Sequence, residues 1–270
     1  MMRRLRRTLA IYGAVASMTS KTFLAYNIWV WVEFFLQIMA MIIFVYFWRA
    51  VYAGGGALNG LTLRQTLNYI LLAQIILPLA QTRAVFRFGF IIREGQLIIE
   101  LLRPLDFQAA EYADSIARLG LYLLLKLPLV VIAWLFFGLQ LPANPAVWGA
   151  FAVALVLGHA VLFFFDWAYA CLAFYTTETW GLSVVREGVA AFFSGALVPL
   201  AFMPGWLQGV ANALPFAQGL YVPISILSGI APLSDVPRLW LVQIIWLVSM
   251  LAASRLIFRV AVRTVTVQGG

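Results

Sequence analysis

The chain has 270 residues, of which 64% are hydrophobic and 10% are charged, and its formal net charge is +8. Soluble domains carry roughly 25% charged residues, so this composition excludes an ordinary soluble protein and predicts an integral membrane protein. The basic residues lie between apolar stretches, where they set topology and meet anionic headgroups. We therefore expect no nucleic-acid partner and a lipid bilayer as the surroundings.

The N-terminus, residues 1–20, is basic and carries apolar residues at helical spacing. This pattern predicts an uncleaved interfacial helix lying on the membrane surface, and a frayed basic tail is the alternative interpretation. A secretory signal is disfavoured because the apolar run spans only about eight residues and contains Tyr12 and Gly13. The basic residues of the predicted interface helix are Arg3, Arg4, Arg6 and Arg7.

Long apolar stretches follow, each near the 20 residues that a helix needs to cross roughly 30 Å of hydrocarbon. They predict an all-α, polytopic fold in which residues 1–270 form a single transmembrane domain. The six predicted spans are residues 25–48, 63–82, 119–139, 147–175, 182–203 and 238–259.

Lysines and arginines outside these spans favour one side of the membrane. Five precede the first span, five lie in 83–118, one lies near residue 186 and three follow residue 254, against three on the other side. Because such residues accumulate in the cytoplasm, both termini are predicted to be cytoplasmic.

The largest polar block is the cytoplasmic segment 83–118. Ile91, Ile98 and Leu102 are spaced to share one face of a helix that Pro104 stops, so this piece is predicted to be amphipathic and to lie along the membrane surface. A solvated loop is one interpretation, and a rigid lever that couples a cytoplasmic motor to the spans is the other. The residues assigned to the lever are Arg93, Glu94, Gly95, Glu100 and Arg103.

Ionisable side chains inside spans are costly and are functional candidates by default. Glu33 and Gln37 stand four residues apart and are expected to satisfy each other, and Lys126 is expected to extend to the headgroups. His159 and Asp166 share a helix face about 10.5 Å apart, so a proton relay would need water or another helix between them. Hydrogen bonding to a second subunit is the favoured interpretation.

The sequence offers little for enzyme or metal chemistry. It has one histidine and one cysteine, too few for a bis-histidine haem or a multi-cysteine metal site. The nearest imitation of a P-loop, at Lys21 and Thr22, lacks the required glycines. We therefore expect no enzyme activity, no metal and no cofactor on this chain.

Residues 188–234 contain no Asp, Glu, Lys or Arg, yet five prolines interrupt them. Unpaired backbone groups are not tolerated in lipid, so residues 204–234 are predicted to form a re-entrant segment on the outer side, covered by protein.

Three stretches resemble permease subunits of type 2 ABC transporters, and the resemblance covers most of the chain. They are Gly-Gln-Leu-Ile-Ile-Glu-Leu-Leu-Arg-Pro-Leu at 95–105, Phe-Ser-Gly-Ala-Leu-Val-Pro-Leu at 193–200 and Leu-Pro-Phe at 214–216.

The resemblance implies an exporter in the bacterial plasma membrane. Two permease subunits, identical or sister chains, would pair with two copies of an ATP-binding subunit that holds Mg-ATP. The interface helix and the 93–103 helix would contact that subunit. The re-entrant hairpin would form an outer gate with Pro199, Pro204, Pro215 and Phe216.

The scarcity of fixed charges in the spans favours an amphipathic or lipid-like substrate. Its translocation path would include Glu33, Gln37, His159 and Asp166. Two alternatives stay open: a proton-coupled secondary transporter that uses these intramembrane acidic residues and the histidine, and a membrane scaffold without an ATPase partner.

Overall fold

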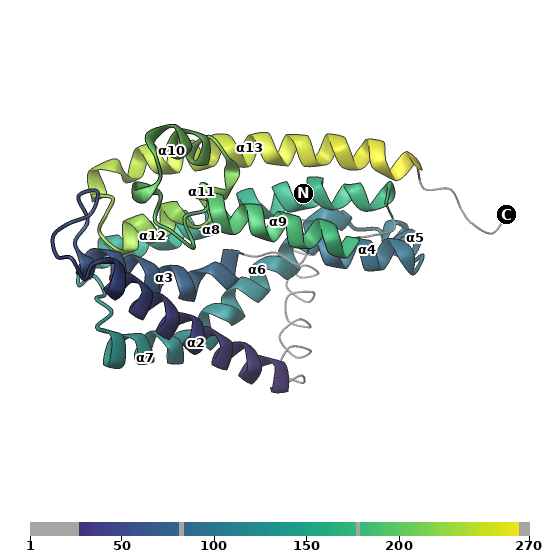
Figure 1. Ribbon diagram of the computed structural model, residues 1–270. Coiled ribbons are helices and arrows are strands. Elements are labelled where there is room, and N and C mark those ends of the chain that lie inside the picture. Colours follow the sequence, from purple (N-terminus) through teal and green to yellow (C-terminus); the bar gives the residue numbers. More distant parts are fainter. Residues whose placement is uncertain (1–26, 81–83, 177–178, 265–270) are drawn as a thin grey trace.

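The computed structural model describes residues 27–80, 84–176 and 179–264 (Figure 1). All regular structure within these residues is helical, apart from a single β-bridge between Leu58 and Leu61. The predicted all-α fold is confirmed. The interface helix predicted for residues 1–20 and the P-loop imitation lie outside the described residues.

The helices of the first half are α2 (Asn27–Val51), α3 (Leu63–Ala80), α4 (Ala84–Arg93), α5 (Leu97–Leu102), α6 (Phe107–Leu125), α7 (Leu127–Phe137) and α8 (Pro145–Ala170) with the 3-10 turn η1 (Cys171–Phe174). Those of the second half are α9 (Thr179–Phe193), η2 (Leu200–Phe202), α10 (Gly205–Asn212), α11 (Pro215–Gly219), α12 (Tyr221–Leu227), η3 (Leu233–Asp235), α13 (Val236–Ala261) and η4 (Val262–Thr264).

Helix α8 forms the centre of the bundle. It packs against α13, α11, α12 and α4, and its second half, from Gly158 to Trp167, is almost entirely buried. In Figure 1, α13 runs along one side of the molecule, α2 and α7 lie on the opposite side, and α4 and α5 lie at the end where α13 finishes.

Three elements meet around Gln243, which is fully buried on α13. Its Nε2 donates to the carbonyl oxygens of Ala154 on α8, at 2.9 Å, and of Gln218 on α11, at 2.8 Å. Close backbone approach makes this possible: a Cβ added to Gly158 would overlap the Gln218 carbonyl oxygen, and one added to Gly219 would overlap a Leu162 side chain. Glycine is therefore required at position 158, where the obstacle is backbone, whereas a larger residue at position 219 would have to displace the buried Leu162 side chain.

Four helical stretches are long and apolar enough to cross a membrane: Trp31–Val51, Phe107–Phe137, Pro145–Phe174 and Leu233–Ala261. They correspond to the predicted first, third, fourth and sixth spans. The third begins twelve residues earlier than predicted, at Phe107, so residues 107–118 extend a long helix instead of forming a separate cytoplasmic piece. That helix is interrupted at Lys126, because Pro128 at the start of α7 has no N–H to donate to the preceding turn.

The predicted second and fifth spans are not among these four. Helix α3 covers 18 residues and carries several polar side chains. Helix α9 ends at Phe193, ten residues before the predicted end of the fifth span, and its 15 residues rise only about 22 Å. The chain turns at Gly195, whose φ of +75° favours glycine, and that turn is why one continuous helix over 182–203 does not form.

The uncharged, proline-interrupted segment folds as the short helices α10, α11 and α12. Pro215–Gly219 and Val222–Leu227 are buried against α8 and, for α12, also against α3. Phe216 packs edge-on against Phe165 of α8, with ring centroids 4.9 Å apart. Protein therefore covers the middle of this segment.

Candidate functional site: a cavity between α6 and α9

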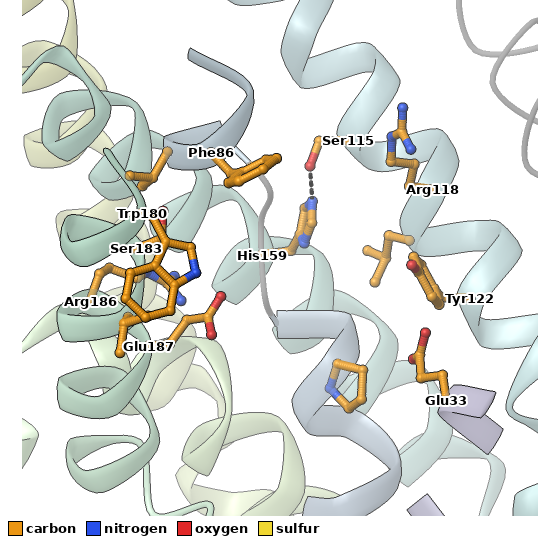
Figure 2. Close-up of a pocket in the computed structure, with 14 residues that line it drawn as sticks. Glu33, Phe86, Ser115, Arg118, Tyr122, His159, Trp180, Ser183, Arg186 and Glu187 are labelled. Atoms are coloured by element: carbon orange, nitrogen blue, oxygen red, sulfur yellow. Dashed lines mark hydrogen bonds between the residues drawn. The ribbon is translucent and has the colours of Figure 1, made fainter. Parts of the chain in front are cut away.

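A cavity of about 460 Å³ lies between α6 and α9. Figure 2 shows His159 of α8 between these two helices, with Phe86 of α4 and Glu33 of α2 on either side. The complete lining is Glu33, Pro78, Val85, Phe86, Ser115, Arg118, Leu119, Tyr122, His159, Trp180, Ser183, Val184, Arg186 and Glu187.

Each flanking helix contributes one face. On α6 the lining residues are Ser115, Arg118, Leu119 and Tyr122. On α9 one set is Trp180, Ser183, Val184 and Glu187, and Arg186 lines the cavity beside it. Both sets follow the i, i+3, i+4, i+7 spacing that places side chains on one side of a helix. The cavity is thus built into the register of both helices.

His159 lies in the wall of this cavity and is only 3% exposed. Its Nε2 is hydrogen-bonded to the Ser115 hydroxyl, 2.9 Å away (Figure 2). His159 therefore has a partner in the same chain, on α6, and hydrogen bonding to a second subunit stays a prediction.

Asp166 makes a bidentate pair with Arg186 of α9. The distances are 2.5 Å from Nε to Oδ1 and 2.7 Å from Nη2 to Oδ2, and the side chains are 0% and 4% exposed. Such a pair, with both charges and both hydrogen bonds satisfied, fixes α9 against α8. Asp166 itself does not line the cavity, whereas Arg186 does.

Lys126 brings Glu33 and Gln37 together. Its Nζ donates to Oε1 of Glu33 at 2.8 Å and to Oε1 of Gln37 at 2.6 Å, and it lies over the Tyr122 ring at 5.6 Å. The expectation that Lys126 extends to the headgroups is wrong, because its side chain is 7% exposed. Glu33 and Gln37 share this ammonium group instead of satisfying only each other.

The three ionisable candidates thus take part in separate contacts. Glu33 pairs with Lys126, His159 with Ser115, and Asp166 with Arg186. A proton relay through these groups stays a prediction that these contacts do not test.

Sequence reasoning missed Arg186 and Glu187. Both lie near the start of the predicted fifth span. Charged residues at that position are readily interpreted as the cytoplasmic end of the span and not as part of a site. The helical spacing of Trp180, Ser183 and Val184 with Glu187 is the signal that could have identified the face.

The predicted lever of residues 93–103 is two helices rather than one. Helix α4 ends at Arg93, Gly95 adopts a φ of +67°, and α5 starts at Leu97. Glu94 and Gly95 are exposed at this turn, and Arg103 pairs with Glu100 at 2.8 Å.

The predicted amphipathic face of the lever is only partly correct. Ile91 is 5% exposed, whereas Ile98 is 40% and Leu102 is 79% exposed, so Ile91 does not share the face of the other two, because the turn at Gly95 separates α5 from α4. Only Leu97 of α5 is buried. The other apolar residues of α5 are exposed and form an apolar surface: Ile98, Ile99, Leu101 and Leu102.

The base of α6 is tied to α13 by two contacts. Asp106 caps α6 by accepting from the Ala109 N–H at 2.8 Å, and it also accepts from Arg255 at 2.5 Å. Two residues further along the chain, Gln108 Nε2 donates to the Ser254 hydroxyl at 2.9 Å. Partial burial opposes ionisation of Asp106, but the two hydrogen bonds and the Arg255 charge outweigh it and lower its pKa.

The described residues contain no group of three or more His, Cys, Asp or Glu side chains that could hold a metal ion. Cys171 is a buried free thiol that donates to the Trp167 carbonyl oxygen.

A family model described as "ABC-2 family transporter protein" matches residues 36–269. No curated protein matches the sequence. The match includes every helix from α3 to α13 and therefore the whole cavity except the turn of α2 that carries Glu33. Together with the apolar helices, this shows that the chain belongs to the ABC-2 transporter family, as a multi-pass membrane subunit of an ABC transporter.

Proposed function

We propose that this chain forms the translocation path of an ATP-driven exporter for an amphipathic or lipid-like substrate in the bacterial plasma membrane. Two permease subunits, identical or sister chains, act with two copies of an ATP-binding subunit that carries Mg-ATP, and both termini are cytoplasmic. The family match over 36–269 carries this proposal. The cavity between α6 and α9 supports it, since it offers both apolar and charged groups to a substrate.

The cavity forms part of the path. Glu33 and His159 reach it directly, whereas Gln37 and Asp166 act indirectly by holding Lys126 and Arg186. Four of the six proposed crossings are the long apolar helices, and α3 and α9 are the other two. Helix α9 is short for a crossing, so the uncharged residues after Phe193 would complete it.

Helices α4 and α5 form the coupling element. Ile99 and Leu102 are 60% and 79% exposed, and an exposed apolar patch with charged neighbours is typical of a protein interface. ATP closure of the motor would move α5, and the Asp106 and Gln108 contacts would pass that movement to α6 and α13. The substrate moves because ATP binds the inward and outward states with different affinity.

The short helices after α9 form the outer gate. Pro199 and Pro204 precede η2 and α10, and Pro215 with Phe216 begins α11. Since α11 is pinned to both α8 and α13 through Gln243, movement of either long helix would displace it.

Charge reversal at the coupling element tests this proposal. A tagged chain with Glu94→Lys and Glu100→Lys should insert into membranes normally but lose the co-purifying ATP-binding subunit, as measured by mass spectrometry of the purified complex. Asp235→Lys is the control for Glu94→Lys, because it also reverses the charge of an exposed carboxylate but lies on η3, away from the coupling element. If the double variant recovers as much ATP-binding subunit as the Asp235→Lys control does, the coupling assignment is contradicted.

A further inference from the structure

Glu187 carries a charge that nothing else described in the structure balances. Three other charged groups of the cavity wall have partners: Glu33 with Lys126, Arg118 with Asp114, and Arg186 with Asp166. Within residues 27–80, 84–176 and 179–264, the Glu187 side chain has no hydrogen-bond or ion-pair partner. The paired charges cancel, so the cavity is left with the negative charge of this carboxylate.

The carboxylate faces the cavity beside aromatic and apolar surface. Glu187 occupies the same face of α9 as Trp180 and Val184, and Figure 2 shows its oxygens directed into the space between α6 and α9. Trp180 is 69% and Phe86 is 55% exposed, so both rings offer surface to a ligand.

This combination of groups selects an organic cation. A carboxylate supplies the counter-charge, and the faces of Trp and Phe rings attract cations and cover an apolar body. A hard metal ion would need several oxygen ligands, and no such group of side chains exists among the described residues. An anion would meet the uncompensated charge of Glu187 and be repelled.

The size of the cavity fits such a ligand. Its volume of about 460 Å³ falls within the roughly 300–1,000 Å³ typical of pockets for drug-sized molecules. Glu187 is exposed, so a ligand in the cavity can reach its carboxylate directly.

We propose that the cavity between α6 and α9 binds amphipathic organic cations, with Glu187 as the counter-charge and Trp180 and Phe86 as the apolar contact surface. This inference rests on the proposed function, in that it names the substrate class of the same path. It predicts that the substrate of the exporter carries a positive charge on an apolar body.

Tetraphenylphosphonium and tetraphenylborate test the charge requirement directly, because they have nearly the same shape and opposite charges. Binding of each radiolabelled ion is measured to the full-length chain in lipid nanodiscs, with binding to empty nanodiscs subtracted. The wild-type chain should bind the phosphonium ion, and Glu187→Gln should weaken that binding by about fivefold, the effect of losing one charge interaction at an exposed site.

Two further variants separate a specific role from a general effect of charge. Asp235→Asn removes one exposed carboxylate outside the cavity and should leave binding unchanged, whereas Glu187→Asp should retain most of it. Glu187→Lys should reverse the preference and favour tetraphenylborate. Equal weakening by Glu187→Gln and Asp235→Asn, or tighter binding of tetraphenylborate than of the phosphonium ion by the wild-type chain, would overturn the assignment.

The binding measurement requires neither ATP nor a partner subunit, so it is independent of the exporter proposal. Glu187-dependent cation binding in a chain that shows no ATP-driven transport would support the site and refute the exporter. ATP-driven transport of a neutral lipid by a chain that does not bind the cation would do the reverse.

Discussion

The buried pair between Asp166 and Arg186 gives the most quantitative test of the helix arrangement. Both side chains are almost inaccessible, and both guanidinium contacts are at most 2.7 Å long. Asp166→Asn would leave a guanidinium buried beside a neutral amide, which costs about 3 kcal/mol or more. Arg186→Met would leave a buried carboxylate, and we expect a similar cost of about 3 kcal/mol.

The double variant should behave differently from the sum of the single ones. Replacing a buried ion pair by groups of similar volume is often close to neutral, so we expect Asp166→Asn with Arg186→Met to lose only about 2 kcal/mol. Independent effects would add to about 6 kcal/mol, so the coupling energy is about 4 kcal/mol. Equilibrium unfolding in mixed micelles measures all four free energies.

Asp106→Asn provides a matched control, because it also converts an aspartate that pairs with an arginine. That pair is exposed, with side-chain exposures of 44% for Asp106 and 37% for Arg255, and asparagine still caps a helix. It should cost about 1 kcal/mol or less. Additive losses in the double variant of Asp166 and Arg186, or equal losses for Asp166→Asn and Asp106→Asn, would refute the buried pair.

Three more outcomes follow from the described contacts. Gly158→Ala should lower the free energy of unfolding by about 2 kcal/mol, since its Cβ would stand 2.9 Å from the Gly219 Cα, and wild-type stability would contradict that packing. Lys126→Met should lower the free energy of unfolding by about 2 kcal/mol, because Glu33 and Gln37 lose the ammonium group that donates to both. Lys126→Arg should restore part of that free energy. The pKa of Asp106 is lowered below its ordinary value of 3.8, so its stabilising contribution is present above that pH and is lost as the pH falls through the folded-state pKa. Thermal unfolding of wild type and Asp106→Asn should therefore differ at pH 7 and converge once the pH has fallen below the folded-state pKa, and a constant difference would disprove the linkage.

The long apolar helices could be predicted from the sequence because each carries its own signal. Helices α8 and α13 hold enough apolar residues to cross a bilayer alone. Their predicted bounds differ from the observed ones by two residues, except at the end of α8, which stops at Ala170, five residues before the predicted end. The end of α9 could not be predicted in this way, because the turn at Gly195 is stabilised by a distant contact, the hydrogen bond from the Tyr69 hydroxyl to the Gly195 carbonyl oxygen.

The partners of the ionisable residues depend on tertiary structure. Lys126 and Glu33 are 93 residues apart, and only the packing of α2 beside the start of α7 brings them together. The spacing of Glu33 and Gln37 predicts a hydrogen bond between these two side chains. In the structure, the side-chain oxygens of both accept from the buried ammonium group of Lys126 instead. The role of Arg186 could not be predicted for the same reason, since its partner Asp166 lies on α8 and Arg186 lies on α9.

The exposed apolar side of α5 illustrates the same limit. The spacing of Ile91, Ile98 and Leu102 fits one continuous helix, but one glycine with a positive φ breaks the register. A glycine in a polar stretch signals a turn only weakly, and the direction of the following helix depends on what Leu97 packs against.

Vesicle transport with purified components tests the central claim most directly. The full-length chain is reconstituted with the ATP-binding subunit that co-purifies with it, and movement of tetraphenylphosphonium and of a fluorescent phospholipid is measured with ATP or with a proton gradient. We predict transport of at least one of these amphipathic probes that requires ATP and the ATP-binding subunit and is lost in the Glu94→Lys, Glu100→Lys variant. Transport by the chain alone, driven by the proton gradient and indifferent to ATP, would contradict the account.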